Sequence, residues 1–191
     1  MHDLIVSAFM TLDGVMEAPG GEPTHPHTGW AGEFMSAEAQ DYKFREVLDA
    51  GTLLIGRTTY ESFAGAWPGY EGPFADRMNS MEKVVVSSTL TEPEWANTRV
   101  LDGDVIAGVR ALKELDGDPV LVNGSATLVH TLLAEGLVDE LRLMVVPLSI
   151  GDGLRLFPAE RNRFEWDPVE TVRFSDSGAR IDVYRLPPTV D

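Results

Sequence analysis

Residues 120–141, VLVNGSATLVHTLLAEGLVDEL, contain the junction that decides the fold. A short β-branched run ends at Asn123-Gly124-Ser125 and is followed at once by an apolar helical pattern, so we expect a strand that turns directly into a helix. The N–H groups at the start of a helix attract anions. The junction therefore predicts an α/β fold with a candidate phosphate site, although it carries neither the GxGxxG nor the GxxxxGKS/T pattern.

Composition restricts the class of protein. The chain has 191 residues, of which 43% are hydrophobic and 24% charged, and we expect one globular domain over residues 1–191. A net charge of −16 opposes binding to nucleic acid and to anionic membranes. The absence of cysteine excludes disulfides and thiolate chemistry. Because the N-terminus lacks the positive charge of a signal peptide and no apolar run approaches the roughly 20 residues that span a bilayer, we expect a cytoplasmic protein.

Apolar runs alternate with helical patterns along the chain. Strands are expected at 3–9, 52–56, 83–88, 98–101, 120–123 and 139–150. Helices are expected at 36–50, 58–67, 104–115 and from 125 onward, the first of them with Phe44, Val47 and Leu48 on one apolar face. Two further strands, 170–174 and 179–186, flank the turn SDSG and predict an antiparallel hairpin. We therefore predict a mostly parallel sheet with helices on both faces and antiparallel strands at the C-terminal end.

Two other strand ends carry polar groups, and ligands of open α/β sheets bind outside the carboxyl ends of the strands. In LLIGRTTYES, Gly56 ends a strand, Arg57 adds a positive charge, and Thr58 with Glu61 fits a capping box. In VVVSSTL, the pair Ser87–Ser88 follows a buried strand. The alternatives are a well-capped helix with a surface arginine and an ordinary turn. Three such junctions on one sheet favour a dinucleotide, whose phosphates need separate donors.

Four segments in this order resemble the dihydrofolate reductase-like superfamily: SAFMTLDGVMEAPGG at 7–21, GRTTYESF at 56–63, KVVVSSTL at 83–90 and the run at 120–157. The resemblance is closest to the branch that contains the C-terminal reductase domain of the bifunctional riboflavin-biosynthesis deaminase-reductase and its stand-alone relatives. It implies a dihydrofolate reductase-like three-layer fold with a central sheet of about eight strands, and it implies NADPH as the cofactor.

The resemblance also implies which residues hold that cofactor. Gly56, Arg57, Thr58 and Thr59 match the motif that holds the cofactor phosphates, and Ser87 and Ser88 match the strand end that meets the adenosine 2′-phosphate. The pyrophosphate loop corresponds to Asn123, Gly124, Ser125, Ala126 and Thr127. The riboflavin branch usually has Glu-Gly-Gly in place of Asn123-Gly124-Ser125, and many of its members have an arginine in place of Ser88. Folate-type relatives have a cis peptide between the two glycines, which makes Gly124–Ser125 a candidate cis bond.

Fewer residues indicate where the substrate would bind. Asp13 matches a residue that lies near the nicotinamide and substrate in relatives and is the candidate proton source, with a role in the Asp-Gly turn as the alternative. Asp41 and Phe44 share one helix face, like the substrate-binding acid and aromatic residue of folate reductases; a solvated acidic face is the alternative. Trp30 and Trp67 are candidates for an aromatic substrate pocket or for ordinary packing. Residues 14–32 are too long for an ordinary connection and are a candidate lid.

Two functions from different classes follow from these residues. We favour an NADPH-dependent reductase that transfers hydride to a small heterocycle or carbonyl compound such as a pterin or pyrimidine, and a true dihydrofolate reductase is the less favoured variant. The alternative is a non-catalytic nucleotide-binding or regulatory protein. No metal site is expected, because His25 and His27 have no third ligand in reach. Relatives use the strand within residues 137–148 at a dimer contact, so we also expect a homodimer.

Overall fold

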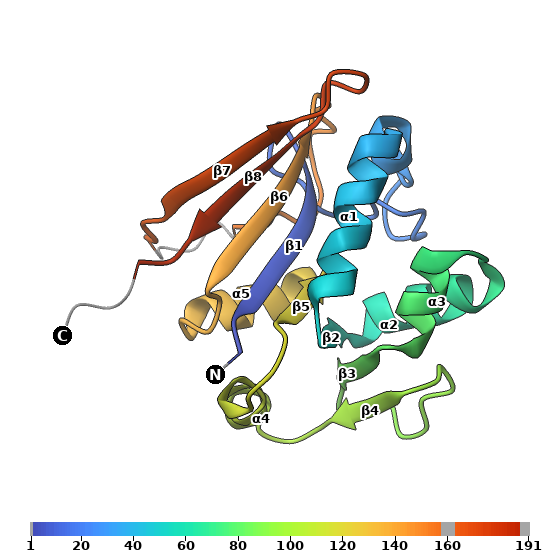
Figure 1. Cartoon of the computed structure of the whole chain (residues 1–191), viewed down its shortest axis with the longest axis vertical. Helices are drawn as coiled ribbons and strands as arrows, with labels where there is room; N and C mark the ends of the chain where they lie inside the picture. Colours follow the sequence, from blue (N-terminus) through green and yellow to red (C-terminus); the bar gives the residue numbers. More distant parts are fainter. Residues whose placement is uncertain (1, 158–162, 188–191) are drawn as a thin grey trace.

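Eight strands form one mixed sheet in the order β4-β3-β2-β5-β1-β6-β8-β7 (Figure 1). The computed structural model describes residues 2–157 and 163–187. The strands from β4 to β6 are parallel, and β8 is antiparallel to both of its neighbours, β6 and β7, so the predicted sheet with its antiparallel C-terminal hairpin is confirmed. The strands are β1 Leu4–Thr11, β2 Thr52–Gly56, β3 Glu82–Val86, β4 Thr98–Leu101, β5 Val120–Asn123, β6 Glu140–Val146, β7 Asp167–Arg173 and β8 Arg180–Arg185.

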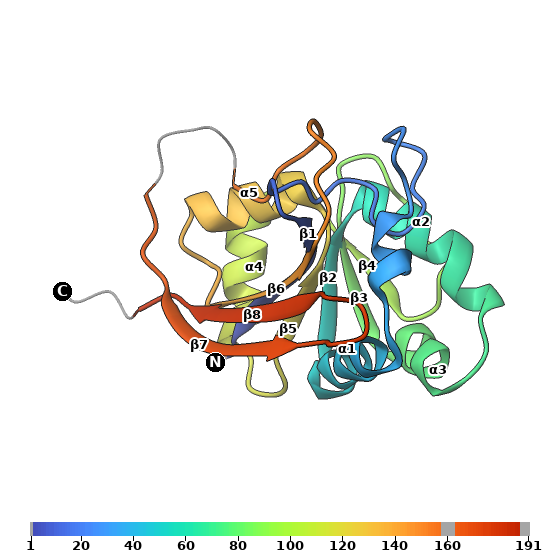
Figure 2. The ribbon, with the colours of Figure 1, turned by 90° about the horizontal axis from the view of Figure 1, so that it is seen from above.

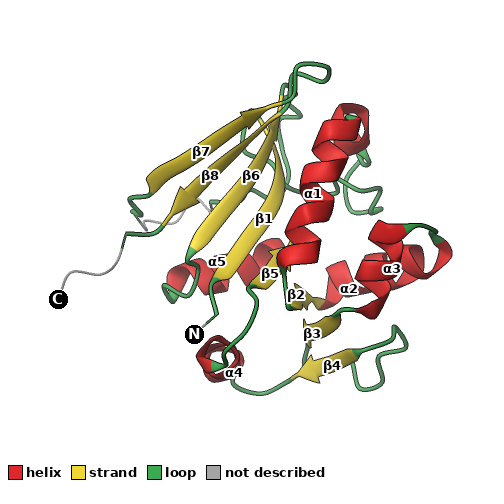
Figure 3. Ribbon diagram, in the orientation of Figure 1, coloured by secondary structure: helices red, strands yellow, loops and turns green. Residues whose placement is uncertain are grey.

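Helices cover both faces of the sheet (Figures 2 and 3). Helices α4 and α5 pack on one face, and α1, α2 and α3 pack on the other. The helices are α1 Ala37–Asp49, α2 Arg57–Ala66, α3 Pro73–Ser80, α4 Val105–Glu114 and α5 Ala126–Ala134, with short 3₁₀ helices at Trp30–Phe34 and Trp67–Gly69. Sequence periodicity does not predict α3, because eight residues give too few turns for an apolar pattern to repeat. No helix of the described residues is both long and apolar enough to cross a membrane.

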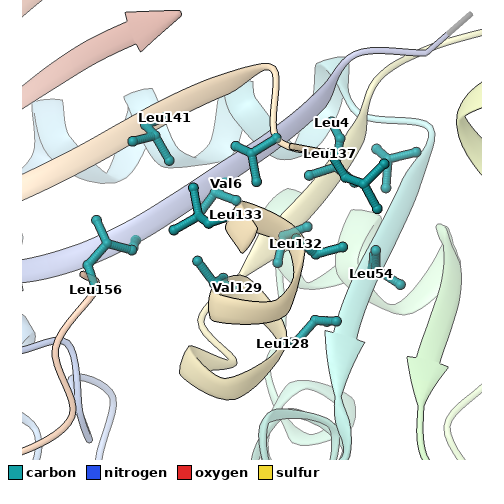
Figure 4. Packing of buried hydrophobic residues seen from close by; sticks show 14 of the residues in the cluster. Leu4, Val6, Leu54, Leu128, Val129, Leu132, Leu133, Leu137, Leu141 and Leu156 are labelled. Atoms are coloured by element: carbon teal, nitrogen blue, oxygen red, sulfur yellow. The ribbon is translucent and has the colours of Figure 1, made fainter. Parts of the chain in front are cut away.

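Helix α5 packs in the largest of the three buried apolar clusters of the described residues (Figure 4). Leu132 and Val129 are fully buried against the even-numbered residues of β1, such as Leu4 and Val6. Ile5, between them, packs in the cluster on the other face. Because β1, β2 and β5 are buried on both faces, their sequences are almost continuous apolar runs, as is typical of parallel strands covered by helices. This arrangement brings the helix starts of α2 and α5 to one edge of the sheet.

Helix α1 buries a different face from the one that its sequence predicts. Val47 is buried as expected, but Leu48 is 49% exposed. The buried positions include Lys43 and Glu46, whose side chains form an ion pair of 2.6 Å between Nζ and Oε2. Hydropathy assigns lysine and glutamate to the surface, whereas a paired lysine and glutamate can be buried. The prediction for this helix face was therefore wrong for Leu48.

Strand β6 lies between β1 and β8, and most of its residues are buried within one chain. It therefore offers little surface for the dimer contact expected of it. The homodimer stays a prediction, and the mass measured by light scattering after size-exclusion chromatography tests it.

Lys83, on β3, is fully buried and gives a pH dependence to stability. Its Nζ donates to the carbonyl oxygens of Asn79 and Met81 at 3.1 and 2.7 Å and lies 4.4 Å from the centroid of the Trp95 ring. Burial, with a smaller contribution from Arg77, lowers the pKa of Lys83 from 10.5 to about 8. Between these pH values the unfolded chain binds more protons than the folded chain, so stability rises with pH.

We expect this contribution to approach about 1.4 kcal/mol per pH unit between pH 8 and pH 10.5. Below pH 8 both states bind the proton, and the contribution is constant. Urea unfolding of the wild-type protein and of Lys83→Met at several pH values measures the difference between their pH dependences. Parallel curves for the two proteins over this range would contradict the prediction.

Candidate functional site

A cleft of about 610 Å³ lies at the carboxyl ends of the central strands. The first residues of α2 and α5 line it, and Ser7 and Phe9 of β1 form part of its floor. The loop after β1 forms another wall, which includes Met16 and Glu17. A cleft at the carboxyl edge of a parallel sheet is the usual place for a ligand in an α/β fold.

The two helices that begin at the cleft have no side-chain cap, whereas two others do. Gly56 and Ser125 are the N-cap residues of α2 and α5, and within the described residues neither caps its helix through a side chain. By contrast, Ser36 caps α1 and Asp104 caps α4. The predicted capping box at Thr58 and Glu61 is therefore wrong, because Glu61 pairs with Arg57 at 3.0 Å. The first-turn N–H groups of α2 and α5 thus remain for a ligand or for water.

Ser125 joins the two helix starts. Its Oγ accepts a hydrogen bond from the N–H of Gly56 at 2.8 Å and donates one to Oγ1 of Thr59 at 2.8 Å. Gly124 and Ser125 both have left-handed backbone angles, with φ of 63° and 62°. A Cβ at position 124 would lie 3.6 Å from Oγ1 of Thr59, so glycine leaves room there. The Gly124–Ser125 bond is trans, as are all peptide bonds in the described chain.

A second hollow, of about 350 Å³, adjoins the cleft and shares Arg57 with it. The Arg57 guanidinium donates from Nη1 to Oγ1 of Thr89 at 2.6 Å, so the positive charge is held at this boundary. Ser87 is buried, and its Oγ accepts hydrogen bonds from the N–H groups of Thr89 and Leu90, which is the predicted alternative of a turn. Ser88 is exposed at the rim of the hollow.

The floor of the cleft carries a buried cluster of polar side chains. Lys43 reaches the cleft from α1, and its Nζ donates to Oγ of Ser7 and pairs with Glu46. Oγ of Ser7 in turn donates to Oε2 of Glu46 at 2.9 Å. Ser7 is in register with Asn123 on β5 and with Arg142 on β6, so these side chains form a polar row on the α1 face of the sheet. Oδ1 of Asn123 is buried and has no hydrogen-bond partner among the described residues.

Most predicted cofactor residues meet at the cleft and its side hollow. Gly56, Arg57, Thr58 and Thr59 line the cleft with Asn123, Gly124, Ser125 and Thr127, and Ser87 and Ser88 line the hollow. Ala126, in the first turn of α5, lies outside the described lining of both. Local motifs at strand ends were therefore sufficient to predict residues that the fold brings together at one cleft.

The four predicted substrate residues lie outside the described lining of the cleft. Asp41 is exposed and pairs with Arg45 at 2.6 Å. Phe44 packs on Phe74, with 5.3 Å between ring centroids. Lys43 is the residue of α1 that faces the cleft, and each residue turns a helix by about 100°, so the side chain two positions earlier points away from it.

Both tryptophan candidates have packing roles. Trp67 packs against Phe74 and Phe63, with 5.1 and 6.3 Å between ring centroids. Trp30 is buried beneath the loop after β1, and its Nε1 donates to the carbonyl oxygen of Glu17 at 2.8 Å. Trp30 therefore supports the cleft wall from behind. The wall is also tied to the loop that follows β6, because the N–H of Met16 donates to the carbonyl oxygen of Leu154 at 2.8 Å.

Asp13, the predicted proton source, supports a loop and lies outside the described lining of the cleft. Its carboxylate accepts hydrogen bonds from Oγ1 of Thr11 at 2.6 Å and from the N–H of Gly151 at 2.8 Å. These bonds, chiefly the one from Thr11, lower the pKa of Asp13. A carboxylate held in the ionised form is a poor proton donor, so the geometry favours the alternative role in the Asp-Gly turn.

Lys43 was missed by the sequence predictions. The signal available was a lysine three residues before a glutamate on a helix that follows the first strand. That spacing is common on solvated helix faces, and only the structure distinguishes the two cases.

Sequence and structure comparisons agree with this architecture. The protein-family model of the RibD C-terminal domain matches residues 2–178. Two Bacillus subtilis (strain 168) proteins are similar: "Uncharacterized protein YyaP", 29% identical with 93% of this chain and 92% of that protein covered, and "Uncharacterized protein YwjB", 25% identical with 78% of each covered.

Two solved structures share the fold. One is the "Putative riboflavin biosynthesis protein" from Shewanella sp. PV-4, with a TM-score of 0.68, 18% identity, and 97% of this chain and 99% of that chain covered. The other is dihydrofolate reductase from Enterococcus faecalis complexed with NADP(H) and RAB-propyl, with a TM-score of 0.62, 17% identity, and 97% and 96% covered. The predicted dihydrofolate reductase-like fold is confirmed. The model of the RibD C-terminal domain covers nearly the whole sequence, and the chain belongs to the RibD C-terminal domain family.

Proposed function

We propose that this protein is an NADPH-dependent reductase that acts on a small heterocyclic or carbonyl substrate. The observation that carries the proposal is the pair of uncapped helix starts, α2 and α5, that face one cleft and are joined through Ser125. Family membership supports a reductase, and the structural neighbour from Enterococcus faecalis was solved with NADP(H). The dinucleotide, when bound, supplies the hydride.

The residues present fit such a cofactor. The N–H groups of the first turns of α2 and α5 would bind its pyrophosphate, since both the free donors and the helix dipoles favour negative charge. Arg57 would bind the 2′-phosphate at the boundary of the side hollow, which is large enough to hold part of the adenosine. Gly124 would let the pyrophosphate approach the backbone closely.

The side hollow also contains an exposed carboxylate, Asp102. An acidic residue in this position suits the free ribose hydroxyls of NADH, whereas an arginine suits the 2′-phosphate of NADPH. We therefore propose that Arg57 sets the preference for NADPH and that Asp102 keeps this preference moderate.

Arg57→Ala tests the proposed cofactor site. We expect the affinity for NADPH to fall about tenfold and the affinity for NADH to change by less than about twofold, because only NADPH carries the 2′-phosphate. Thermal-shift titrations with both nucleotides measure this, since a ligand that binds only the folded state raises stability by about 2.7 kcal/mol at a hundredfold excess over Kd. Arg99→Ala, at another exposed arginine outside the cleft, is the control.

Equal losses for NADPH and NADH would place Arg57 elsewhere than at the 2′-phosphate. An absence of any shift with either nucleotide in the wild-type protein would overturn the proposal as a whole. Tight NADPH binding without oxidation of NADPH by any pterin, pyrimidine or quinone would instead support the non-catalytic alternative.

A further inference from the structure

We infer that a proton path passes between α1 and the sheet: Lys43 gives a proton to the substrate in the cleft, and Glu46 replaces that proton from a separate hollow behind the cleft. This inference rests on the proposed function, because the reduction of a C=N or C=O bond consumes one proton for each hydride. It assigns a role to a hollow that a ligand in the cleft would leave open.

The rear hollow has a volume of about 340 Å³ and lies between α1 and the strands β6, β7 and β8. The described lining of the rear hollow and that of the cleft have no residue in common. Its charged lining residues are Arg45, Glu46, Asp49, Glu140, Arg142 and Glu170. A hollow of this size and polarity is able to hold water.

One ion pair separates the cleft from the rear hollow. Lys43 lines the cleft, Glu46 lines the rear hollow, and Nζ of the lysine lies 2.6 Å from Oε2 of the glutamate. The other oxygen, Oε1, is buried without a hydrogen-bond partner among the described residues and lies 3.8 Å from Nη1 of Arg142, which also lines the rear hollow. Buried carboxylate oxygens that lack a protein partner usually bind water. Oε1 is therefore the atom at which water of the rear hollow would meet the ion pair.

Lys43 has the proton that the reaction needs. Paired with Glu46 it is an ammonium, which is the protonated form, whereas the ionised Asp13 has no proton to give. When the carbon of a C=N or C=O bond receives the hydride with its two electrons, the π bond breaks and the nitrogen or oxygen takes the negative charge. That atom is more basic than an amine, so it takes a proton from Nζ and becomes N–H or O–H. Lys43 is left as a neutral amine.

Glu46 restores the ammonium. Its carboxylate takes a proton from the solvent of the rear hollow at Oε1, and rotation of the carboxyl group brings that proton to the side that faces Nζ. The neutral amine then takes the proton, which regenerates the ion pair. For each hydride, one proton leaves the solvent and one N–H or O–H bond forms in the product, so atoms and charges balance. Lys43 is the catalytic residue, and Glu46 acts through it as a positioning residue.

The groups around Glu46 suit such a path. Two carboxylates of the rear hollow, Asp49 and Glu170, are exposed and attract protons from the solvent. Burial, together with the charge of Glu46, raises the pKa of Tyr42 to about 12, so the phenol of this lining residue keeps its proton at neutral pH. The rear hollow therefore combines a source of protons with a neutral hydroxyl beside the buried carboxylate.

Access to Lys43 from the cleft is limited by comparison. The residue is only 8% exposed, and its Nζ lies 5.2 Å from the centroid of the Phe9 ring on the cleft floor. A dinucleotide and a substrate in the cleft would cover the remaining exposed surface. A proton that returns through the cleft would have to wait until the product leaves, whereas the rear hollow stays open throughout.

Exchange of the Lys43 ammonium protons with water tests the path. The chain has three lysines, Lys43, Lys83 and Lys113, so isotope labelling of lysine nitrogen gives three side-chain signals in an NMR spectrum. We expect saturating NADP⁺ to slow the exchange at Lys43 by less than about twofold, because the rear hollow remains open. Lys83 and Lys113 lie outside the described lining of the rear hollow and are internal controls.

Val169→Trp closes the rear hollow. Val169 is 56% exposed on the edge strand β7 and lines the hollow, so a larger side chain there fills the hollow without disturbing the core. We expect this variant to slow exchange at Lys43 by at least about tenfold and to leave exchange at the other two lysines unchanged. Arg173→Trp, an exposed position of the same strand outside the described lining, is the matched control.

The rate of reduction tests Lys43 as the proton donor. Because Lys43→Met alone would leave Glu46 buried without its partner, the lysine is tested in the double variant Lys43→Met/Glu46→Leu. With a pterin, pyrimidine or quinone that the wild-type protein reduces, we expect this variant to lose at least about a hundredfold in kcat while its affinity for NADPH changes by less than about twofold.

Unchanged exchange in Val169→Trp, or a tenfold loss of exchange on NADP⁺ binding, would overturn the path, because the protons would then pass through the cleft. A double variant with the wild-type kcat would remove Lys43 as the donor. NADPH binding without reduction of any of these compounds would leave the path no reaction to serve and would overturn the inference, while the cofactor site would stand. If NADP⁺ does not bind, the proposed function fails first, and the comparison of Val169→Trp with Arg173→Trp still tests the path.

Discussion

Thr58→Asp should lower the affinity for NADPH by about a hundredfold while raising the stability of the protein without ligand. Thr58 is exposed in the first turn of α2 and lines the cleft. A carboxylate in the first turn satisfies the helix dipole, which stabilises a helix by about 0.3–1 kcal/mol. The same carboxylate would stand where a phosphate binds, and repulsion of about 3 kcal/mol at a few ångströms gives the hundredfold loss.

The opposite signs of the two effects make the prediction specific. Urea unfolding measures the stability, and quenching of tryptophan fluorescence by NADPH measures the affinity. Ala37→Asp adds the same charge to the first turn of α1, which starts outside the cleft, and should leave NADPH affinity unchanged. A variant at position 58 that loses stability would indicate misfolding, and one that binds NADPH normally would contradict the phosphate site.

Glu46→Ala should destabilise the protein by about 3–5 kcal/mol, the largest loss that we expect from a single substitution in the cleft floor. Glu46 is 4% exposed, and its carboxylate pairs with the Lys43 ammonium at 2.6 Å. It also lies 3.8 Å from the guanidinium of Arg142. Removal of the Glu46 carboxylate leaves a buried cation without its counter-ion. The free-energy cost of that unpaired charge is larger than the net stabilisation that the ion pair provides.

The double variant Lys43→Met/Glu46→Leu separates the cost of an unpaired buried cation from the contribution of the ion pair to stability. Replacing both charges by apolar side chains of similar size removes the unpaired ion, so we expect most of the stability to return. Arg142 keeps its bond to Glu140 at 2.6 Å in this variant. Chemical denaturation of the two variants and the wild-type protein should therefore give a non-additive coupling of about 2 kcal/mol or more. A double variant less stable than Glu46→Ala would show that the ion pair itself is net stabilising.

The sequence was sufficient for the fold, and for the convergence of the candidate cofactor residues on one cleft, because both depend on local patterns. Glycine at the end of a strand followed by a helix start is visible at Gly56 and at Gly124, and the parallel sheet then brings the two junctions together. The antiparallel hairpin follows in the same way from alternation on either side of the SDSG turn.

The substrate half could not be predicted, because it depends on partners distant in sequence. Asp13 accepts a hydrogen bond from the N–H of Gly151, 138 positions away, and this bond ties the carboxylate to the loop after β6. Lys43 faces the floor because Ser7, 36 positions earlier, offers a hydroxyl at that level of β1. Hydropathy alone would place Lys43 and Glu46 in solvent.

The polar row across the sheet also determines how the strands align during folding. Strands β1, β5 and β6 are apolar on both faces for most of their length, so burial of apolar side chains alone would tolerate a slip of one residue. Such a slip would move Ser7 and Arg142 to the opposite face, where Leu132 and Val129 of α5 lie. An arginine among leucines is too costly to persist, and the charged floor therefore serves as a register mark that excludes misaligned sheets before any ligand is present.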